Sequence, residues 1–563
     1  MQFRTIVRVT CACSLGAGAL FAQAAPRAGD DLLGLWGAEP MLGPQVRGEL
    51  LLERHAGRYT MRIAGFEASG PVTGDSVVIA LPGGQGTLRV WISGTALRAF
   101  WVQPAGINSP YALPVRLRSA GPGAWRGMVT PIEAQFPLYL VIRRADDGTL
   151  RGVFRNPAQN WPGRVADYVV ARDGASVTFT HPRTGVLQWR QPYDSARRTI
   201  AFDFDAPIVL SPRTTEQAVG FVPRSPTLGA YEYRRPADIG DGWTVGSADG
   251  VALDRAALVN VVRGLASTDP LSDATPRVHA LLVARRGQLV LEEYFRGYGH
   301  DMPHDLRSAS KTMTSIMVGA AMHNGAPISA STALPGTGIT VAHLLSHSSG
   351  LACDDDDDAS PGNEDRMQSQ RVQDDWYAFF LALPKVREPG AAYSYCSAGI
   401  NITGKLLGTA TRRWLPDLFD SQLAQPMQFG PYGINLMPTG EAYSGGGMHI
   451  RPRDLLKFGQ LYLDGGIWRG RRLVSAGWVR ESTAHHIDRT DGSDDGLGWH
   501  RHLLTIGSRR IQTYEASGNG GQFLVVVPEL QLTIVVTAGN YGQYGIWKAI
   551  RTELVPAVIR AAR

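Results

Sequence analysis

The chain has 563 residues, of which 44% are hydrophobic and 19% charged, with 65 Gly and 35 Pro. These values exclude a disordered chain, a coiled coil and a collagen, and the length predicts about two or three domains. The net charge of +6 is not gathered in a Lys/Arg-rich block. Nucleic acid is therefore not expected as a partner.

The N-terminus has the pattern of a secretion signal. A short basic region with Arg4 and Arg8 precedes the apolar stretch Val9 to Phe21, and a small-x-small cleavage site ends at Ala24. The apolar stretch is too short for a membrane anchor, and no other segment approaches ~18 apolar residues. We expect residues 1–24 to be a signal peptide and the mature protein to be periplasmic or secreted, without a transmembrane segment.

Residues 25–230 are predicted to form an all-β accessory domain, either a sandwich or a barrel. Short runs rich in β-branched and aromatic residues alternate with turn signals, as in Gly48–Glu53 and Tyr59–Ile63 around His55-Ala56-Gly57. Residues 231–250 are rich in Gly, Pro and Asp and lack periodicity, which indicates a linker.

The pattern changes after the linker, and residues 251–563 are predicted to form a mixed α/β domain. Helical periodicity alternates here with strand-like runs. The clearest examples are the helical segments Asp254–Leu265, Thr312–Asn324 and Pro452–Asp464, and the strand-like segments Ala280–Ala284, Gly521–Val527 and Leu532–Thr537.

The most informative motif is Ser308-Ala309-Ser310-Lys311, which opens an apolar helical run. Residues i and i+3 lie on one face of a helix, so the Ser308 hydroxyl and the Lys311 amine are expected to meet. Burial lowers the pKa of a lysine toward the neutral amine, which can take the proton of a serine nucleophile. The helix N-terminus adds positive potential that stabilises an oxyanion. The alternative interpretation is a surface lysine without a catalytic role.

Two later segments carry chemistry that fits a serine nucleophile. Tyr395 stands two residues before Ser397, ahead of a helical run, and a phenol can pass protons to a leaving group. The Gly-rich run Ser517–Gln522 precedes a strand. Glycine lets the backbone approach a bound carbonyl, so this run can supply one amide of an oxyanion hole beside the amide of Ser308.

Taken in order, Ser308-x-x-Lys311, Tyr395-x-Ser397 and Asn519-Gly520-Gly521 resemble the motifs of the serine β-lactamase and penicillin-binding-protein superfamily. The segment His343–Leu351 looks like the branch with class C β-lactamases, family VIII esterases and 6-aminohexanoate-dimer hydrolases. Tyr-Cys-Ser paired with Gly-Gly-Gln is most similar to the last group. The resemblance covers about residues 240–563.

The resemblance implies an antiparallel sheet flanked by helices, with a helical subdomain between Ser308 and about Gly445. It implies Ser308 as the nucleophile, Lys311 as its base and Tyr395 as a second acid/base. The oxyanion hole and substrate-binding residues would be the Ser308 amide together with Ser397, Asn519, Gly520, Gly521 and Gln522, with the second amide at or beside Gln522. No metal or organic cofactor is implied.

Two positions depart from the superfamily pattern. The third motif usually begins with Lys or His, a cation that helps to hold a substrate carboxylate, and here it begins with Asn519. Ser397 stands where β-lactamases have Asn. Both departures disfavour β-lactamase and D-Ala-D-Ala peptidase activity, which remain alternatives, and favour a neutral small-molecule ester or amide as the substrate.

Three functions stay open on the sequence. The favoured one is a secreted serine hydrolase that cleaves an ester or amide through an acyl-enzyme on Ser308. The second is a binding or sensor protein that uses the same pocket, or the β domain, without turnover. The third is a structural envelope protein, which makes the three spaced motifs a coincidence.

Cys353 and Cys396 remain after signal cleavage, and in an oxidising compartment they are predicted to form one disulfide, with two buried free thiols as the alternative. The run Asp354–Asp358 lacks the alternating ligands and turn glycine of an EF-hand loop. We expect a solvated loop, with a cation site or a field that repels anionic substrates as alternatives. No His or Cys pattern supports a metal site.

Overall fold

The computed structural model describes residues 29–562 except 42–45, 95, 105–109, 133–135, 159–166, 204–206 and 371–373. The predicted signal peptide, residues 1–24, lies outside the described residues. Among the helices of the described residues, none has the length and apolarity needed to cross a bilayer. The described residues form a closed barrel, a 12-stranded sheet, a 9-stranded sheet and a separate two-stranded hairpin.

The N-terminal region is all-β, as the sequence predicted, but it consists of two units. The first unit, called the barrel below, is a closed antiparallel sheet whose interior is filled by Trp36, Phe154, Phe179 and Phe202. Its strands are β1 (Gly34–Ala38), β11 (Leu138–Arg144), β12 (Leu150–Arg155), β13 (Tyr168–Asp173), β14 (Ser176–Thr180), β15 (Leu187–Asp194), β16 (Thr199–Asp203) and β17 (Pro207–Pro212).

The second unit, called the inserted sheet, lies in the chain between β1 and β11. It is an antiparallel meander that curls on itself, since a Cβ at Gly127 in β10 would lie 2.6 Å from Val115 in β8. Leu52, Met61 and Trp101 are among its buried core residues. Its strands are β2 (Gly48–His55), β3 (Arg58–Ile63), β4 (Phe66–Thr73), β5 (Ser76–Ala80), β6 (Thr87–Ser93), β7 (Ala96–Gln103), β8 (Tyr111–Val115), β9 (Arg118–Gly121) and β10 (Ala124–Val129).

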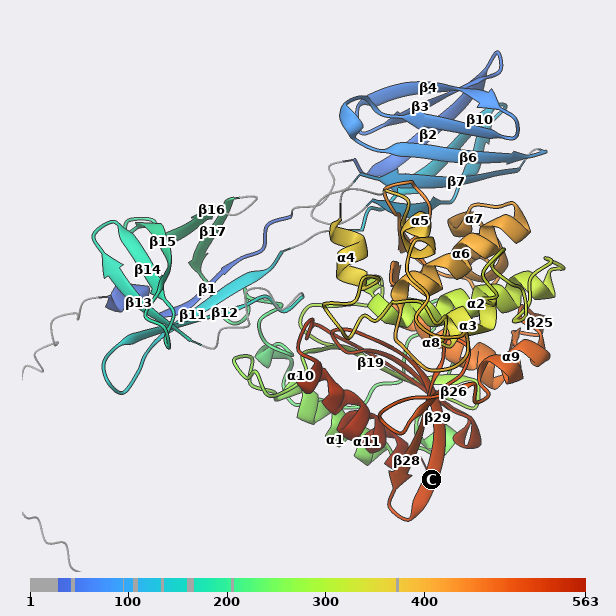
Figure 1. Ribbon diagram of the computed structural model, residues 1–563. Helices are drawn as coiled ribbons and strands as arrows, with labels where there is room; N and C mark the ends of the chain where they lie inside the picture. The colour runs from blue at the N-terminus through green and yellow to red at the C-terminus, as the bar shows by residue number, and fades with distance from the viewer. Residues whose placement is uncertain are drawn as a thin grey trace, which may run out of the picture.

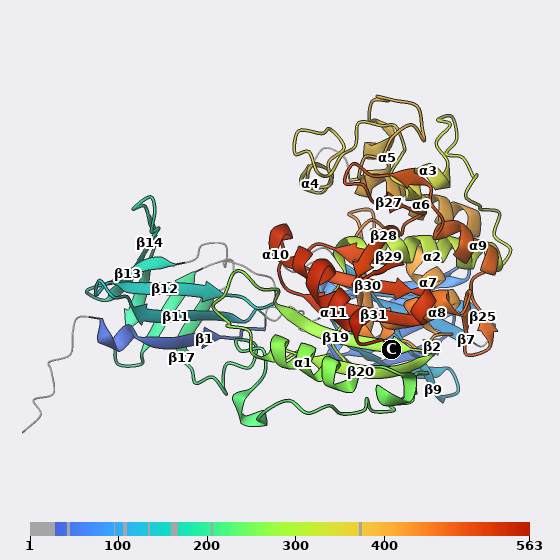
Figure 2. The same cartoon turned by 90° about the horizontal axis from the view of Figure 1, so that it is seen from below.

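The inserted sheet continues into the C-terminal domain. β8 pairs with β22 (Tyr432–Asn435), which pairs with β23 (Met448–Ile450), and β23 pairs with β21 (His304–Asp305). Figures 1 and 2 show the inserted sheet against the C-terminal domain, whereas the barrel lies apart from the sheet. A single 12-stranded sheet therefore crosses from one part of the chain to the other.

The C-terminal domain is built on the 9-stranded sheet, in the order β18-β20-β19-β31-β30-β29-β28-β27-β26. All its strand pairs are antiparallel except β18 with β20. The strands are β18 (Thr244–Val245), β19 (Val278–Arg285), β20 (Gln288–Tyr294), β26 (Ile487–Asp488), β27 (Asp494–Asp495), β28 (His500–Ile506), β29 (Arg509–Gly518), β30 (Gln522–Val527) and β31 (Leu532–Ala538).

Helices pack on both faces of this sheet because alternate residues of its central strands are apolar on both sides. Leu524 and Val526 of β30 face one core, with α2 and α8, while Phe523 and Val525 face the other, with α1, α10 and α11. These helices are α1 (Arg255–Ala266), α2 (Ser310–His323), α8 (Pro452–Leu463), α10 (Tyr544–Ala549) and α11 (Val555–Arg560), with α9 (Ala476–Ser482) beside α2.

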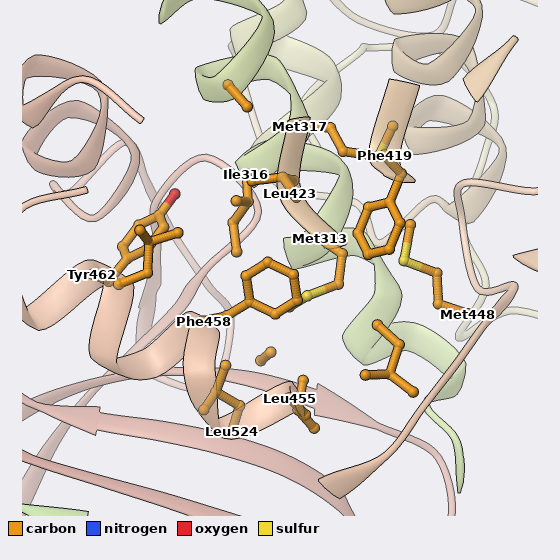
Figure 3. Close-up of a cluster of buried hydrophobic side chains, with 14 of the residues drawn as sticks. Met313, Ile316, Met317, Phe419, Leu423, Met448, Leu455, Phe458, Tyr462 and Leu524 are labelled. Atoms are coloured by element: carbon orange, nitrogen blue, oxygen red, sulfur yellow. The ribbon is translucent and has the colours of Figure 1, made fainter. Parts of the chain in front are cut away.

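The helix α2 is buried along most of its length between α8 and a helical subdomain. Figure 3 shows Met313, Ile316 and Met317 of α2 among Phe419, Leu423 and the α8 residues Leu455 and Phe458. The subdomain contains α3 (Val341–Leu345), α4 (Glu364–Ser369), α5 (Trp376–Leu381), α6 (Ser397–Thr411), α7 (Leu415–Phe419) and the π-helical turn Asp420–Ala424. This arrangement matches the sheet flanked by helices and the helical subdomain that the resemblance implied.

The segment expected to be a linker is packed against the C-terminal domain. Thr244 and Val245 form β18 at the edge of the sheet, and the buried Asp241 accepts a hydrogen bond from Arg453 Nε at 2.7 Å. Arg453 also pairs with Glu292. The Gly- and Pro-rich composition of residues 231–250 therefore gives an irregular path, and these contacts give the segment a defined position.

Candidate active site

The first residues of the candidate site lie where the chain turns into α2. Ser308 belongs to the short 3-10 turn η5 (Arg307–Ala309), and α2 begins at Ser310. Lys311 Nζ donates a hydrogen bond to Ser308 Oγ at 2.9 Å. Lys311 is 3% exposed and Ser308 is half-buried. The i, i+3 spacing thus brings the hydroxyl and the amine together inside the domain.

Tyr395 lies beside this pair, just before α6. Lys311 Nζ is 4.9 Å from the centre of its ring, and the Tyr395 hydroxyl interacts with both Ser308 and Lys311. Burial raises the pKa of Tyr395, and the charge of Lys311 and the contact with Ser308 offset part of that rise. The structure therefore brings together the three side chains that the sequence motifs singled out.

The loop that carries Tyr395 is held from behind by His347 and by a disulfide. The rings of His347 and Tyr395 lie 4.6 Å apart, and His347 Nδ1 accepts a hydrogen bond from the Cys396 amide at 3.1 Å. Burial lowers the pKa of His347 to about 3, so its ring is neutral and can accept. Cys396 and Cys353 form a disulfide that ties this loop to the acidic run after Cys353.

Two carboxylates that the sequence analysis did not assign to the site lie next to Ser397. Asp355 accepts from the Ser397 amide at 2.7 Å and from the Glu364 amide at 2.8 Å, while Glu364 accepts from Ser397 Oγ at 3.1 Å. Tyr443 also donates to Glu364. We call Asp355 and Glu364 the acidic pair. Burial and the charge of Glu364 raise the pKa of Asp355 to about 6.

The acidic pair changes the electrostatics of Lys311. Burial acts to lower the pKa of Lys311, but Tyr395, Glu364 and Asp355 outweigh it, so the pKa lies above the ordinary value. Burial and the helix N-terminus were expected to lower the pKa of Lys311, and that expected direction is wrong. The whole acidic run was likewise expected to be a solvated loop. That is correct for the exposed Asp356, Asp357 and Asp358, but Asp355 is partly buried in the site.

Gly518, the last residue of β29, lies against the backbone of Ser308. A Cβ at Gly518 would lie 2.2 Å from the Leu306 carbonyl oxygen, 3.1 Å from the Ala309 nitrogen and 3.2 Å from the Ser308 nitrogen. No residue with a side chain could approach the turn so closely. Gly518 is thus the strand residue that meets the nucleophile. It belongs to the Gly-rich run Ser517–Gln522 singled out from the sequence, in which the oxyanion amide was expected at or beside Gln522.

The residues predicted as the third motif and its oxyanion amide, 519–522, form the turn between β29 and β30 and the start of β30. Gly520 and Gly521 have φ values of 94° and 100° and form the turn between β29 and β30. Gln522 lies on β30, between β29 and β31, and its side chain donates to the Ala538 carbonyl at 2.7 Å. Asn519 is exposed and accepts from the Gly542 amide at 2.9 Å. The side chains of Asn519 and Gln522 are thus engaged in contacts of the β29–β30 turn with the strand end and loop at residues 538–542.

No cluster of three or more His, Cys, Asp or Glu side chains arranged to hold a metal ion was found in the part of the chain that the structure describes. The acidic pair has backbone amides and hydroxyls as its partners. The Ser308 hydroxyl thus lies next to the amine of Lys311 and the phenol of Tyr395. The N-terminus of α2 and the end of β29 lie close to the backbone amide of Ser308.

Comparisons with known proteins find similarity in the C-terminal part of the chain. Residues 274–545 match the family model described as Beta-lactamase. The chain is 30% identical over 231 residues to the 6-aminohexanoate-dimer hydrolase of Paenarthrobacter ureafaciens. That match covers 38% of this chain and spans 58% of the relative's length.

Among solved structures, a family VIII carboxylesterase is 19% identical, with 51% of this chain and 91% of that chain covered and a TM-score of 0.40. A penicillin-binding-protein homologue from Caulobacter crescentus is 16% identical, with 54% and 97% covered and a TM-score of 0.45.

Proposed function

Residues 274–545 form a β-lactamase-family domain of the serine β-lactamase and penicillin-binding-protein superfamily, and on this premise we propose that the protein is a serine hydrolase that cleaves an ester or amide. The observation that carries the proposal is the contact of Lys311 Nζ with Ser308 Oγ, with Tyr395 beside both. A serine hydroxyl next to a coupled amine and phenol can act as a nucleophile, because these neighbouring groups can accept its proton.

In the proposed first step, Ser308 Oγ attacks the substrate carbonyl and its proton passes to the Lys311–Tyr395 pair. Lys311 and Tyr395 titrate as a coupled pair. The active form of the pair has lost one proton, compared with the state in which Lys311 is an ammonium and Tyr395 a neutral phenol. This form becomes more populated as the pH rises, and because the pKa values of Lys311 and Tyr395 are both raised, the increase lies at alkaline pH. We expect acylation to accelerate above neutral pH.

The negative charge that develops on the carbonyl oxygen needs hydrogen-bond donors. The Ser308 amide lies at the N-terminal end of α2, where backbone dipoles favour negative charge. Because Gly518 lies against this amide, we assign the second donor to the backbone that follows Gly518, in place of Gln522. The pair returns its proton to the leaving alcohol or amine, and water then hydrolyses the acyl-Ser308 ester.

For the substrate, we propose linear amides and short-chain esters. The curated relative is named for the hydrolysis of 6-aminohexanoate dimer, and one similar solved structure is named a carboxylesterase. Asn519 brings no cation to the site, which disfavours β-lactams and D-Ala-D-Ala peptides. We also propose that the protein acts outside the cytoplasm, since the disulfide Cys353–Cys396 suits an oxidising compartment.

The first test is intact-mass spectrometry after treatment with a fluorophosphonate. We expect one adduct on the wild type and on Ser331→Ala, which changes an exposed serine, and none on Ser308→Ala. Turnover of p-nitrophenyl esters and linear amides is then compared for the wild type and Lys311→Arg, with nitrocefin and a D-Ala-D-Ala peptide as controls. Arginine keeps the charge but cannot serve as a base, so Lys311→Arg should be inactive.

The outcomes of this test distinguish the hydrolase from the sensor alternative and test the role of Lys311. A folded wild type without an adduct overturns the hydrolase proposal. An ester substrate that leaves a lasting acyl group on Ser308 supports the sensor alternative, because a hydrolase releases it. Normal turnover by Lys311→Arg removes Lys311 from the mechanism.

A further inference from the structure

The strand β21, residues His304 and Asp305, leads into the turn that carries Ser308. It is the edge strand of the 12-stranded sheet that begins in the inserted sheet. Neighbouring residues of a strand point to opposite faces, so His304 and Asp305 meet different surroundings. The N-terminal region reaches β21 on both of these sides, each time through one residue of the C-terminal domain, His279 or His449.

On the first side, His304 is linked by hydrogen bonds to the barrel. Its Nε2 lies 2.8 Å from His279 Nδ1, and His279 Nε2 lies 2.8 Å from the carbonyl oxygen of Pro157, two residues beyond β12. A carbonyl only accepts, so His279 Nε2 donates to Pro157, while either ring can donate in the bond between His279 Nδ1 and His304 Nε2. Both rings are buried, and Tyr298 stacks on His279 at 4.0 Å.

On the second side, Asp305 lies opposite His449 of β23 in the strand register. The ring of Tyr111, the first residue of β8 in the inserted sheet, packs edge-on against His449 at 4.8 Å. Both Tyr111 and His449 are buried. The inserted sheet therefore supports the face of β21 that carries Asp305, through side chains as well as through the strand pairs.

Asp305 in turn holds the residue before the nucleophile. Its Oδ1 accepts from the Arg307 amide at 3.0 Å, and its Oδ2 pairs with Arg307 Nε at 2.8 Å. Arg307 has a φ of 48°, in the left-handed region that residues other than glycine seldom adopt. Its guanidinium lies over the Tyr541 ring at 5.0 Å. Such a backbone conformation persists when surrounding contacts over-determine it.

We propose that the N-terminal β region is part of the catalytic scaffold: the barrel and the inserted sheet hold β21 from two sides, and Asp305 acts as a positioning residue that sets the backbone of Arg307 and Ser308. This inference rests on the proposed function of Ser308. The role differs from that of an independent binding module, which would contact the C-terminal domain without constraining its active-site turn.

The test uses the full-length protein and measures the rate constant of fluorophosphonate labelling at Ser308, together with kcat and KM for a p-nitrophenyl ester. A displacement of about 1 Å at a reacting group costs ~100-fold in rate. We therefore expect Asp305→Ala to slow labelling by about 100-fold and Tyr111→Leu by about 10-fold. Asp305→Asn keeps an acceptor for the Arg307 amide but loses the ion pair, and should fall between the wild type and Asp305→Ala.

Two control variants separate positioning from general destabilisation. Asp301→Ala removes an exposed carboxylate from the same segment, and Tyr59→Leu removes a buried ring from the inserted sheet, in its core and away from β21. Both controls should label within about twofold of the wild type, even where Tyr59→Leu lowers Tm as much as Tyr111→Leu does. The loss in the test variants should appear in kcat, with KM changed by less than about twofold.

The outcomes distinguish this inference from the proposed function. A labelled wild type whose Asp305 and Tyr111 variants label at the wild-type rate overturns the scaffold inference and leaves the hydrolase proposal standing. A loss of labelling in Tyr59→Leu equal to that in Tyr111→Leu also overturns it. A folded wild type that does not label overturns the proposed function and the inference with it.

Discussion

The barrel and the inserted sheet come from one continuous all-β stretch of sequence, yet they meet the C-terminal domain in different ways. The barrel closes on itself, so its strands have no free edge. It contacts the domain near the end of β12, where Arg155 pairs with Asp273 at 3.0 Å and Pro157 accepts from His279. The inserted sheet is open and shares strand pairs with the domain.

Side chains strengthen the second of these junctions. Arg98 and Arg116 of the inserted sheet pair with the buried Asp417 and Asp420 at 2.7 and 2.6 Å, and Trp91 stacks on Trp414 at 5.5 Å. The inserted sheet has an open edge strand and complementary charges, so it is joined to the C-terminal domain. The barrel has no open edge, so it stays a separate unit. The comparison therefore predicts that the inserted sheet unfolds with the C-terminal domain and the barrel unfolds apart from it.

The largest expected effects come from removing a buried tryptophan in each unit. Trp36→Ala in the barrel and Trp101→Ala in the inserted sheet should each cost about 3–5 kcal/mol, because both rings are fully buried. Calorimetry, with fluorophosphonate labelling at each temperature, should show that Ser308 stops reacting at a lower temperature in Trp101→Ala, whereas unfolding of the barrel in Trp36→Ala slows the labelling of Ser308 without abolishing it. Equal loss of labelling in Trp36→Ala contradicts the separation of the units.

The next effect concerns the ion pairs at the junction. Arg116→Met removes the bidentate partner of the Asp420 carboxylate, whose side chain is 2% exposed, and should cost about 1–3 kcal/mol, because Tyr432 and Gln425 still donate to this carboxylate. The matched control Arg126→Met breaks the exposed Arg126–Glu49 pair of the same sheet and should cost less than about 1 kcal/mol. Urea unfolding measures both. Similar losses would show that the junction adds nothing beyond a surface pair.

The barrel contact should weaken in acid through its buried histidines. Burial lowers the pKa of His304 to about 4 and that of His279 well below its usual value, against about 6.5 in the unfolded chain. Between these values the unfolded chain binds protons that the folded chain does not, so the free energy of unfolding falls as the pH falls from about 6.5 to 4. His279→Phe should reduce proton uptake on unfolding by about one, as measured by the pH dependence of stability. An unchanged slope would remove His279 from this effect.

The smallest effect tests the acidic pair, whose hydrogen bonds among the described residues lie within the C-terminal domain. Asp355→Asn removes a charge that raises the pKa of Lys311, so the rise of labelling rate with pH should move to lower pH. The shift should be the same when Trp36→Ala is also present, since the hydrogen bonds of the acidic pair in the described part of the chain are made within the C-terminal domain. Asp357→Asn changes an exposed carboxylate of the same run and serves as the control. A shift toward higher pH would contradict the electrostatic account of Lys311.

Sequence reasoning succeeded where a few neighbouring residues decide the geometry. The contact between Ser308 and Lys311 follows from helical spacing, and the change from an all-β to an α/β pattern follows from periodicity. It singled out the run Ser517–Gln522 but did not single out Gly518 within it, because the residue that reaches the nucleophile depends on where the β29–β30 hairpin turns. It missed the acidic pair, because Asp355 and Glu364 meet Ser397 only through the folded loop.

By itself the sequence determined the all-β and α/β regions, the local Ser308–Lys311 pair and the order of the motifs, since these depend on residue type and short-range spacing. The tertiary structure decided that the β region divides into a closed barrel and an open sheet, that β21 joins that open sheet and that the pKa of Lys311 rises. The physical reason is that strand order, hairpin register and the charges around a buried amine arise from contacts between segments far apart in the chain.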